Sequence, residues 1–365
     1  MSATASQGIS IHPPHIHDWR STSRVTWLCG ISLVPVVAWS AALYGWPAIT
    51  VWLASVAAAV LSQLAVDALR HRLSLADGSA VLTGLLVATA MPPGIAPHVP
   101  AAASAFAVII VKGVFGGQGS NWMNPALGGI AFAYANWPGA MREFIMPRML
   151  SGVDGLSAST PLAFAKDLAS SGSARIMDTI HQAGYPVSAL DTSVTNVLNG
   201  SLFEHLGARL PDGYVDILLG FRPGALGESA LFLVLLGSVF LLSLKLIKAE
   251  IPMAMLVVFA LLSMLFGTGL PGEAVYGGDA LFALGGGGVL IVAFYMATDP
   301  VTSPASRFLA LFYGALIGTL SYLFRRWGGH PEGVAYAVLI ANVVMPTLER
   351  RVDPLFRGLA RRRPA

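Results

Sequence analysis

The sequence has little charge, and this scarcity limits the class of protein. Only 11% of the 365 residues are charged, whereas 55% are hydrophobic and the mean hydropathy is +0.67. A soluble globular domain carries about 25% charged residues. A water-soluble chain of this length could not cover its surface with so few charges, so we expect much of the surface to face lipid. The net charge is only +3, and the basic residues occur in short clusters. The sequence therefore predicts no extended basic surface for binding nucleic acid.

Cysteine is almost absent, because Cys29 is the only one in the sequence. An intrachain disulfide and a cysteine-ligated cluster within this chain are therefore excluded. Cys29 falls in an apolar segment, where it is either a small buried hydrophobe or a contact to a cofactor shared with a partner subunit. The N-terminus lacks the basic-then-apolar order of a signal peptide. His12, His15 and His17 straddle two prolines there, which favours a tail over a metal site.

Long apolar segments are what the sequence has in abundance. A membrane-spanning helix needs about 20 mostly apolar residues, and ten segments meet or approach this length. Several are short or flanked by Gly and Pro, a pattern typical of half-helices that are buried in protein or line a cavity. The predicted spans are 24–44, 47–69, 79–91, 99–114, 124–137, 226–247, 251–268, 280–297, 305–324 and 331–348.

Basic residues predict the orientation, because short cytoplasmic loops are enriched in Lys and Arg. Basic pairs follow the second and sixth spans, and six arginines follow the tenth. All these groups fall inside if both termini are cytoplasmic, whereas Arg325 and Arg326 fall outside as a mild violation. We therefore predict a cytoplasmic tail, a first five-helix repeat, an extracytoplasmic segment, a second five-helix repeat and a basic cytoplasmic tail. Their bounds are 1–23, 24–137, 138–224, 225–348 and 349–365.

The two five-helix units resemble each other in sequence. Residues 77–92 read DGSAVLTGLLVATAMP and residues 284–300 read LGGGGVLIVAFYMATDP, and residues 124–134 (NPALGGIAFAY) likewise resemble residues 330–338 (HPEGVAYAV). With five spans in each unit, the second must be inverted relative to the first. Inverted repeats place a functional site between the units, framed by broken helices. The predicted fold is an all-α polytopic membrane protein with about ten helices in two inverted repeats.

The extracytoplasmic segment contains the stretch SGVDGLSASTPL at residues 151–162. From the residue types alone, this is a hydroxyl-rich turn followed by a short helix. Pro161 suits the first helical turn and Thr160 suits the N-cap. This structural interpretation explains the residues without any function.

The same stretch resembles the flavinylation site of the family that includes the D component of Rnf-type complexes and the B component of the sodium-pumping NADH:quinone oxidoreductase. In that family the acceptor threonine precedes Pro-Leu, so the resemblance implies FMN joined through its phosphate to the hydroxyl of Thr160. Ser159 is a second candidate hydroxyl, because the family usually has Gly-Ala or Ser-Ala before the acceptor. We expect the turn to be exposed, since a separate flavin transferase must reach it. The matching residues are Asp154, Gly155, Ser157, Thr160, Pro161 and Leu162.

Further blocks resemble the same family over about residues 20 to 350. They are GGQGSNWMNP at 116–125, GFRPGALGES at 220–229, MATDPVTSP at 296–304 and PEGVAY at 331–336. The resemblance implies a subunit of an ion-translocating oxidoreductase of the bacterial inner membrane, which relays electrons coupled to Na⁺ or H⁺ movement and is not catalytic alone. It implies membrane and peripheral partner subunits, including a second flavin-bearing subunit and iron–sulfur subunits. The related quinone-reducing subunit also holds riboflavin noncovalently between its halves, which implies a second flavin here.

Other polar residues are candidates for the site, each with a structural alternative. Asn121 and Asn124 could donate to a flavin ring or a phosphate, or satisfy freed backbone groups in a re-entrant turn. Arg222 could pair with the FMN phosphate or anchor the chain at the interface. Glu228 could line an ion path, bond a flavin or pair with Arg222. Asp299 is either a helix stop or part of a second flavin or quinone pocket.

The alternative function is a channel or secondary transporter without a cofactor, because inverted repeats with broken helices suit that class as well. The hydroxyl-rich turn discriminates between the two, since a channel does not require it. Lys112, near the end of the fourth span, is expected to extend its ammonium to the membrane interface.

Overall fold

The computed structural model describes most of the chain. The described residues are 22–71, 73–148, 157–168, 176–182, 186–207, 209–268, 278–328 and 333–360. Asp154, Gly155 and the three N-terminal histidines lie outside these ranges, so the predictions made for them stay predictions.

The first half of the chain is helical throughout its predicted spans. Pro47 lies in the first turn of its helix, and Asn124 caps the helix that begins at Pro125, as expected for residues that start helices. The fourth span changes from α-helical to π-helical partway along, which is common near functional sites. The elements are α1 Thr22–Tyr44, α2 Trp46–Arg70, η1 Leu75–Asp77, α3 Ser79–Thr89, α4 His98–Phe106, η2 Ala107–Val114 and α5 Pro125–Asn136.

The second half is also helical in each predicted span, with three differences in the bounds. The span predicted at 280–297 is broken after Gly285, the span predicted at 226–247 begins at Leu231, and the last helix continues to Ala360. The elements are α11 Leu231–Ser243, α12 Glu250–Phe266, α13 Ala280–Gly285, α14 Val289–Ile291, η7 Val292–Met296, α15 Arg307–Trp327 and α16 Val334–Ala360. Of the described helices, α1, α2 and α15 are long and apolar enough to cross a membrane on their own.

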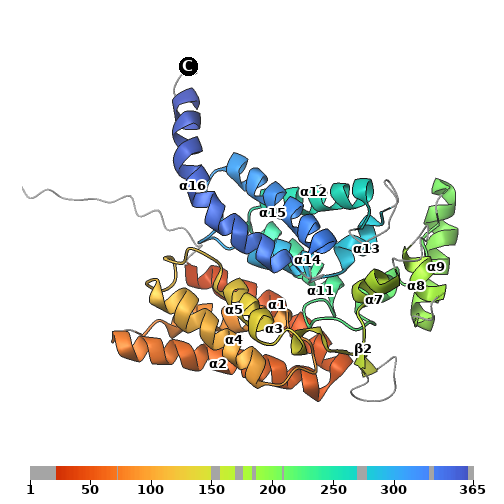
Figure 1. The fold of residues 1–365 in the computed structure, drawn as a ribbon, viewed down its shortest axis with the longest axis horizontal. Helices are drawn as coiled ribbons and strands as arrows, with labels where there is room; N and C mark the ends of the chain where they lie inside the picture. Colours follow the sequence, from red (N-terminus) through yellow and green to blue (C-terminus); the bar gives the residue numbers. More distant parts are fainter. Residues whose placement is uncertain are drawn as a thin grey trace, which may run out of the picture.

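The segment between the halves is mostly helical but contains one short ladder. Phe144 pairs with Ala158 and Ile145 with Ser157 in an antiparallel two-stranded sheet, a small departure from the all-α prediction. The elements are η3 Ala140–Arg142, β1 Phe144–Ile145, β2 Ser157–Ala158, α7 Pro161–Leu168, α8 Ile176–Gln182, α9 Ala189–Leu198, η5 Asn199–Phe203, η6 Glu204–Leu206 and α10 Tyr214–Leu219. Both α8 and α9 lie beyond one end of the helical bundle (Figure 1).

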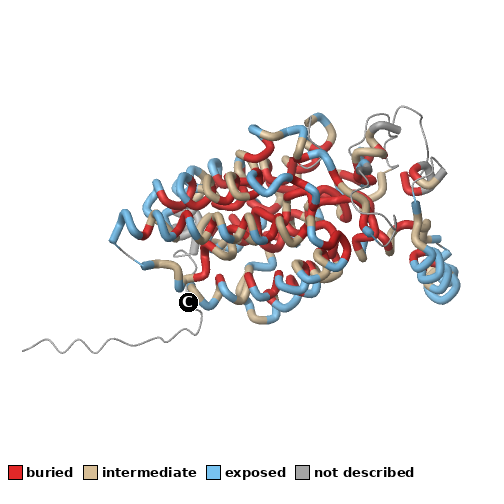
Figure 2. Tube along the Cα trace, turned by 90° about the horizontal axis from the view of Figure 1, so that it is seen from below, coloured by how far each residue is buried: buried red, intermediate tan, exposed pale blue. Residues whose placement is uncertain are grey.

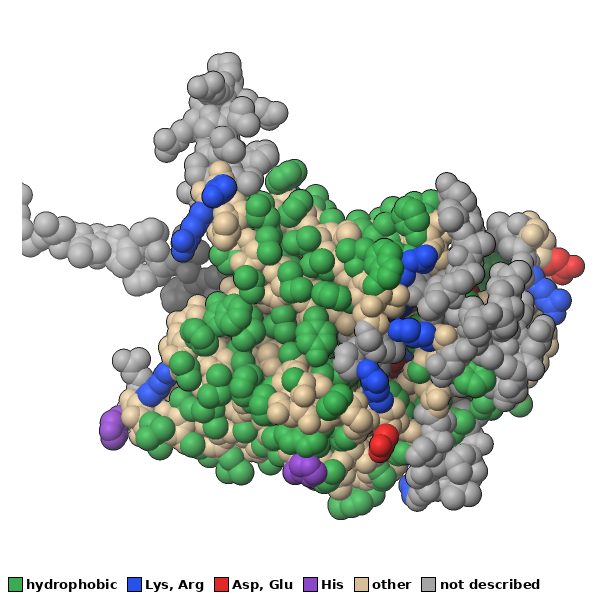
Figure 3. Space-filling model, viewed as in Figure 1, with side chains coloured by type: hydrophobic (Ala, Val, Ile, Leu, Met, Phe, Trp, Pro, Cys, Tyr) green, Lys and Arg blue, Asp and Glu red, His purple; other side chains and the backbone are tan. Residues whose placement is uncertain are grey.

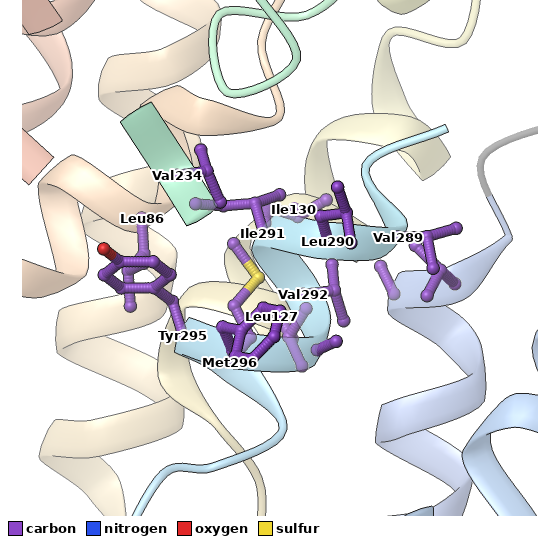
Figure 4. Close-up of a cluster of buried hydrophobic side chains, with 14 of the residues drawn as sticks. Leu86, Leu127, Ile130, Val234, Val289, Leu290, Ile291, Val292, Tyr295 and Met296 are labelled. Carbon is purple, nitrogen blue, oxygen red and sulfur yellow. The ribbon is translucent and has the colours of Figure 1, made fainter. Parts of the chain in front are cut away.

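The two halves form two layers that share one core. In Figure 1, α1–α5 lie in one layer and α11–α16 in the other, and α1 contacts α11 while α5 contacts α16. Buried residues run through the middle of the bundle, whereas α9 is largely exposed (Figure 2). Side chains of α14 and η7 pack between Leu86 of the first half and Val234 of the second, beside Leu127 and Ile130 of α5 (Figure 4). The core therefore lies at the junction of the halves.

The outer surface of the bundle is apolar. Hydrophobic side chains cover the middle of the face in Figure 3, and charged side chains lie mainly toward its two ends. Leu53 and Leu61 of α2 are 60% and 65% exposed, and Leu261 of α12 is 51% exposed. Water-facing surfaces rarely carry contiguous apolar areas of this kind. Together with the apolar helices, this surface supports a multi-pass membrane protein.

A buried carboxylate holds α9 against α10. Asp191, with no exposed surface, accepts hydrogen bonds from the backbone N–H groups of Gly213 (2.7 Å) and Asp216 (2.8 Å) and from the hydroxyl of Thr195 (3.1 Å). Asp216 in turn accepts from the amide of Ser188 at 2.8 Å. Burial raises the pKa of the Asp216 carboxyl, and the Ser188 donors offset part of that rise.

We expect Asp191→Ala to loosen this part of the chain. The substitution leaves two buried backbone N–H groups without an acceptor, at a cost of about 3 kcal/mol. Hydrogen exchange of the α9–α10 amides should accelerate while exchange in α2 stays unchanged. Glu204→Ala, at an exposed position of η6, is the matched control. Equal exchange in the two variants would contradict a structural role for Asp191.

Candidate functional site

The helix of the eighth predicted span is broken by four consecutive glycines. Gly287 and Gly288 have φ values of 69° and 67°, in the left-handed region that glycine adopts without steric cost. The break lies inside the protein, because Gly285, Gly286 and Gly287 are buried. Water cannot satisfy freed backbone groups at such a position, so protein side chains must do so.

Two buried arginines and one buried glutamate satisfy this break. Arg222 donates to the carbonyl of Gly285, and Arg325 donates to the carbonyls of Ala283 (2.5 Å) and Gly286 (2.8 Å). The carboxylate of Glu228 accepts from the amides of Gly287 and Gly288. The cations therefore meet the end of α13 and the anion meets the start of α14, as the helix dipole favours. We call these three side chains the break cluster.

The break cluster carries more positive than negative charge. Arg222 and Glu228 are 3.9 Å apart and form an ion pair, and Arg325 also lies 4.7 Å above the ring of Phe259. Arg222, Glu228 and Arg325 are each only 3% exposed. The Nε atom of Arg222 is buried and has no hydrogen-bond partner among the described residues. The cluster can therefore accept a further anionic or hydrogen-bond-accepting group.

The predicted flavinylation turn lies beside the break cluster. A Cβ atom placed on Gly286 would lie 3.8 Å from Cβ of Leu162, and the ammonium of Lys166 donates to the carbonyl of Gly328 at 3.1 Å. These contacts attach α7 to the second half. The pairing of β2 with β1 attaches the preceding residues to the chain that follows α5. Residues 157–168 are thus attached to both halves.

Thr160 has the capping role that the sequence predicts, but its side chain is not exposed. Its hydroxyl accepts from the amide of Ala163 at 3.1 Å, and its carbonyl accepts from Phe164 at 2.9 Å. The side chain is buried, whereas neighbouring Ser159 is exposed. The expectation of an exposed Thr160 is therefore wrong, because capping draws its hydroxyl toward α7 while Leu162 packs inward. The backbone of Ser157 forms part of β2.

A second site lies between the halves, at the opposite end of the span that is broken at residues 285–288. It is a cavity of about 1180 Å³ whose walls come from α1, α2, α3, η2, the glycine-rich loop 116–125, and the chain from Phe294 to Val301. Cys29, Asn121, Asn124 and Asp299 all contribute to its walls. We call this space the inner cavity. The structure thus brings together residues from both halves that the sequence separates widely.

The two asparagines of the inner cavity have different roles. Asn124 accepts from the amide of Ala126 at 2.9 Å as the cap of α5, and it donates to the carbonyl of Met296 at 3.0 Å. It therefore links the start of α5 to the end of η7, as the structural interpretation of this loop predicts. Asn121 is 9% exposed, and its Oδ1 atom is enclosed without a hydrogen-bond partner in the described part of the chain. Asp299 accepts from the amide of Val301 at 3.2 Å, as a helix stop does.

The predicted site residues thus divide between two places. Arg222 and Glu228 lie at the helix break, near Leu162 of the helix that Thr160 caps, whereas Asn121, Asn124 and Asp299 line the inner cavity. Two buried cations, Arg325 and Lys112, were not predicted as part of either place.

Each of these cations departs from its expected position. The sequence predicts an outer-loop position for Arg325, against the enrichment of Lys and Arg in cytoplasmic loops. This mismatch is the signal that could have indicated a buried position for Arg325. Lys112 does not extend to an interface, because it is only 3% exposed and lies in the cavity wall.

Comparison with known proteins identifies the class. Residues 9–357 match the model of the NQR2, RnfD, RnfE family, and the chain belongs to this family. The resemblance predicted from the sequence blocks is therefore confirmed.

Relatives of known name align along nearly the whole chain. The D component of the proton-translocating ferredoxin:NAD(+) oxidoreductase complex of Clostridium ljungdahlii is 32% identical over 349 residues, covering 95% of each chain. The D component of the ion-translocating oxidoreductase complex of Stutzerimonas stutzeri is 35% identical over 345 residues, covering 93% of this chain and 92% of the relative. The corresponding Escherichia coli K12 protein is 33% identical over 357 residues, covering 94% of this chain and 97% of the relative.

We expect Glu228→Ala to destabilise the protein strongly. Removing one partner of a buried ion pair leaves two buried guanidinium groups without a carboxylate, at a cost of about 3–5 kcal/mol. Thermal unfolding in detergent should therefore shift to a clearly lower temperature.

Glu250→Ala provides the matched control for this measurement. Glu250 pairs with Arg307 at 3.4 Å, but the Arg307 side chain is 91% exposed, and exposed pairs contribute about 0–1 kcal/mol. Similar melting shifts in the two variants would show that the break cluster does not support the helix break.

Proposed function

We propose that this chain is a membrane subunit of a redox-driven ion-translocating electron-transport complex, carrying FMN on Thr160 through a phosphoester. Family membership and the names of the relatives support the complex, since those proteins are subunits of ion-translocating oxidoreductases. The bound flavin would accept and pass on electrons, coupled to movement of Na⁺ or H⁺. The protein would hold the group and set its surroundings.

The observation that carries the proposal is the position of Thr160 at the start of α7, two residues before Leu162, which lies beside Gly286 of the helix break. Helix N-termini favour phosphate because their free N–H groups and dipole attract anions. The amide of Ala163 already donates to the Thr160 oxygen at 3.1 Å. The buried excess of positive charge on Arg222 and Arg325 favours a phosphate nearby. Asp154, Gly155 and Ser157 belong to the same proposed attachment segment.

The proposal includes ten membrane spans in two inverted repeats of five, in the bacterial inner membrane. Three features support the repeat. Both α3 and α14 begin after a left-handed glycine, Gly78 with φ 74° and Gly288 with φ 67°. The second helix of each half packs on the fourth, α2 on α4 and α12 on α15, and α1 with α11 and α5 with α16 pair equivalent helices across the halves. Both termini would be cytoplasmic and residues 138–224 extracytoplasmic.

The proposal also includes partners, because the relatives are named as subunits of complexes. These would be other membrane and peripheral subunits, among them a second flavin-bearing subunit and iron–sulfur subunits. A flavin transferase would attach FMN during maturation. The exposed hydroxyl of Ser159 beside the buried hydroxyl of Thr160 makes the attachment position a question for experiment.

We propose the inner cavity as the site of a second, noncovalent flavin. The carboxamide of Asn121 complements the imide edge of an isoalloxazine, where an N–H donor lies next to a carbonyl acceptor. An oxidised quinone offers acceptors only and would leave Oδ1 of Asn121 without a partner, which costs free energy in a buried site. This favours a flavin over the quinone alternative. Asp299 and Asn124 would form the opposite wall, and ligand sites commonly lie in such cavities.

A channel or secondary transporter without a cofactor is the competing function, because the broken helices and the cavity suit that class too. The hydroxyl-rich turn discriminates between the two, since transport alone needs no acceptor hydroxyl at Thr160.

In-gel fluorescence tests the attachment site. The chain coexpressed with a flavin transferase should fluoresce under ultraviolet light after denaturing electrophoresis, because only a covalent flavin survives denaturation. Thr160→Val should abolish the fluorescence, and Ser159→Ala should retain it.

Two results would change the conclusion. A dark band from the parent chain would reject the covalent flavin and favour the transporter alternative. A fluorescent Thr160→Val with a dark Ser159→Ala would move the attachment by one residue.

Riboflavin binding tests the inner cavity separately. Purified Thr160→Val chain in detergent should quench riboflavin fluorescence on binding. Adding Asn121→Leu should raise the Kd about tenfold, as expected for losing about 1.4 kcal/mol of hydrogen bonding. Asn136→Leu is the control, since Asn136 is exposed at the end of α5 and its amide donates within that helix, to Phe132. Equal Kd values for both asparagine variants would remove Asn121 from the site, and no binding at all would remove the second flavin.

A further inference from the structure

Lys112 holds a buried positive charge that the flavin sites do not account for. It lies in the π-helical segment η2 and is 3% exposed, and its side chain reaches the wall of the inner cavity. A buried ammonium is costly unless it is compensated by charge and hydrogen bonds. The groups around the Lys112 ammonium therefore show how its charge is compensated.

Two oxygen atoms contact the Lys112 ammonium directly. Nζ donates to Oε1 of Gln63 at 2.8 Å and to the hydroxyl of Ser79. Gln63 donates from its own Nε2 to Asp67 at 2.7 Å, and Ser79 donates its hydroxyl proton to Asp77 at 2.5 Å. Both donors thus point away from the ammonium, toward carboxylates. Only lone pairs point toward it.

The two carboxylates fix this arrangement. Asp67 also accepts from the amide of Ser74 at 2.7 Å, and Asp77 accepts from the amide of Ser79 at 2.8 Å. Neither Gln63 nor Ser79 can turn a donor inward without losing its bond to a carboxylate. The result is a seat of neutral oxygens backed by two negative charges, and hard cations prefer such oxygen ligands. We call it the cation seat.

Other charged groups surround the seat without changing its character. Arg70 extends from α2 to donate to the carbonyl of Gly113, next to Lys112 in the chain. Asp299 lines the same cavity from the second half. The charged side chains of the cavity wall are thus Asp67, Asp77, Asp299, Arg70 and Lys112, so the wall needs the Lys112 charge to approach neutrality.

We propose that the cation seat is a monovalent-cation site that the Lys112 ammonium fills permanently, and that Na⁺ takes its place when the lysine side chain is removed. The cavity beside Lys112 gives water access to complete the coordination of a small ion. The intact chain then holds a cation at this point without drawing Na⁺ from solution. If Lys112 were only an ordinary ion-pair partner of the carboxylates, the chain without the lysine side chain would not bind Na⁺ at this point.

Thermal unfolding of Lys112→Ala in detergent tests the proposal. The variant should melt at a higher temperature in sodium chloride than in an equal concentration of choline chloride, by roughly 2 °C when Na⁺ is about ten times its Kd. The parent chain and Lys248→Ala should melt alike in the two salts. Lys248 is the matched control because its ammonium donates to the carbonyl of Pro304 at 2.5 Å and lies outside the cavity wall.

A second substitution shows whether the carboxylates create the site. Adding Asp67→Asn to Lys112→Ala should abolish the difference between the salts, because half of the negative charge behind the seat is lost. Lys112→Ser provides an independent variant, since it opens the same space and adds one oxygen ligand. Equal melting of Lys112→Ala and Lys112→Ser in both salts overturns the proposal, and so does failure of both variants to fold in sodium chloride.

Discussion

A helix that breaks inside a membrane protein must satisfy its freed backbone groups without water, and much of this structure follows from that constraint. At residues 285–288 the groups are satisfied by charge, with Arg222 and Arg325 on the carbonyls and Glu228 on the amides. These side chains come from the chain just before α11 and from the end of α15, so the break fixes how the second half assembles. Leu162 at the start of α7 lies beside Gly286 of the same break, so the position of α7 depends on the break as well.

The first half meets the same requirement at the other end of the bundle. There α3 begins after Gly78, with the Asp77 carboxylate accepting from the first helical amide and Lys112 donating to Ser79. In each half a helix that starts after a left-handed glycine, α3 or α14, thus has a carboxylate and a cation beside it, and the cation comes from the end of the fourth span. Lys112 and Arg325 correspond in this sense. The two places differ in that Arg325 binds backbone directly, whereas Lys112 binds side chains.

The sequence predicts the helices better than it predicts the sites. Each predicted span contains helix because long apolar runs leave few alternatives. The start of α11 at Leu231 was missed because residues 226 and 227 instead bond the carbonyls of Met91 and Thr89, a contact between distant segments. The cap at Thr160 follows from local spacing, but its burial depends on packing against the second half. Likewise, no local pattern shows that residues 121 and 299 share a cavity or that residue 112 is enclosed.

Asn124 joins the two halves with a single side chain, since its amide caps α5 and also holds the carbonyl of Met296. The backbone bonds from Leu226 to Met91 (3.0 Å) and from Gly227 to Thr89 (2.7 Å) cross the same junction. A motion in which one half of the chain rocks against the other would break all three connections at once. These three hydrogen bonds therefore oppose relative motion of the two halves.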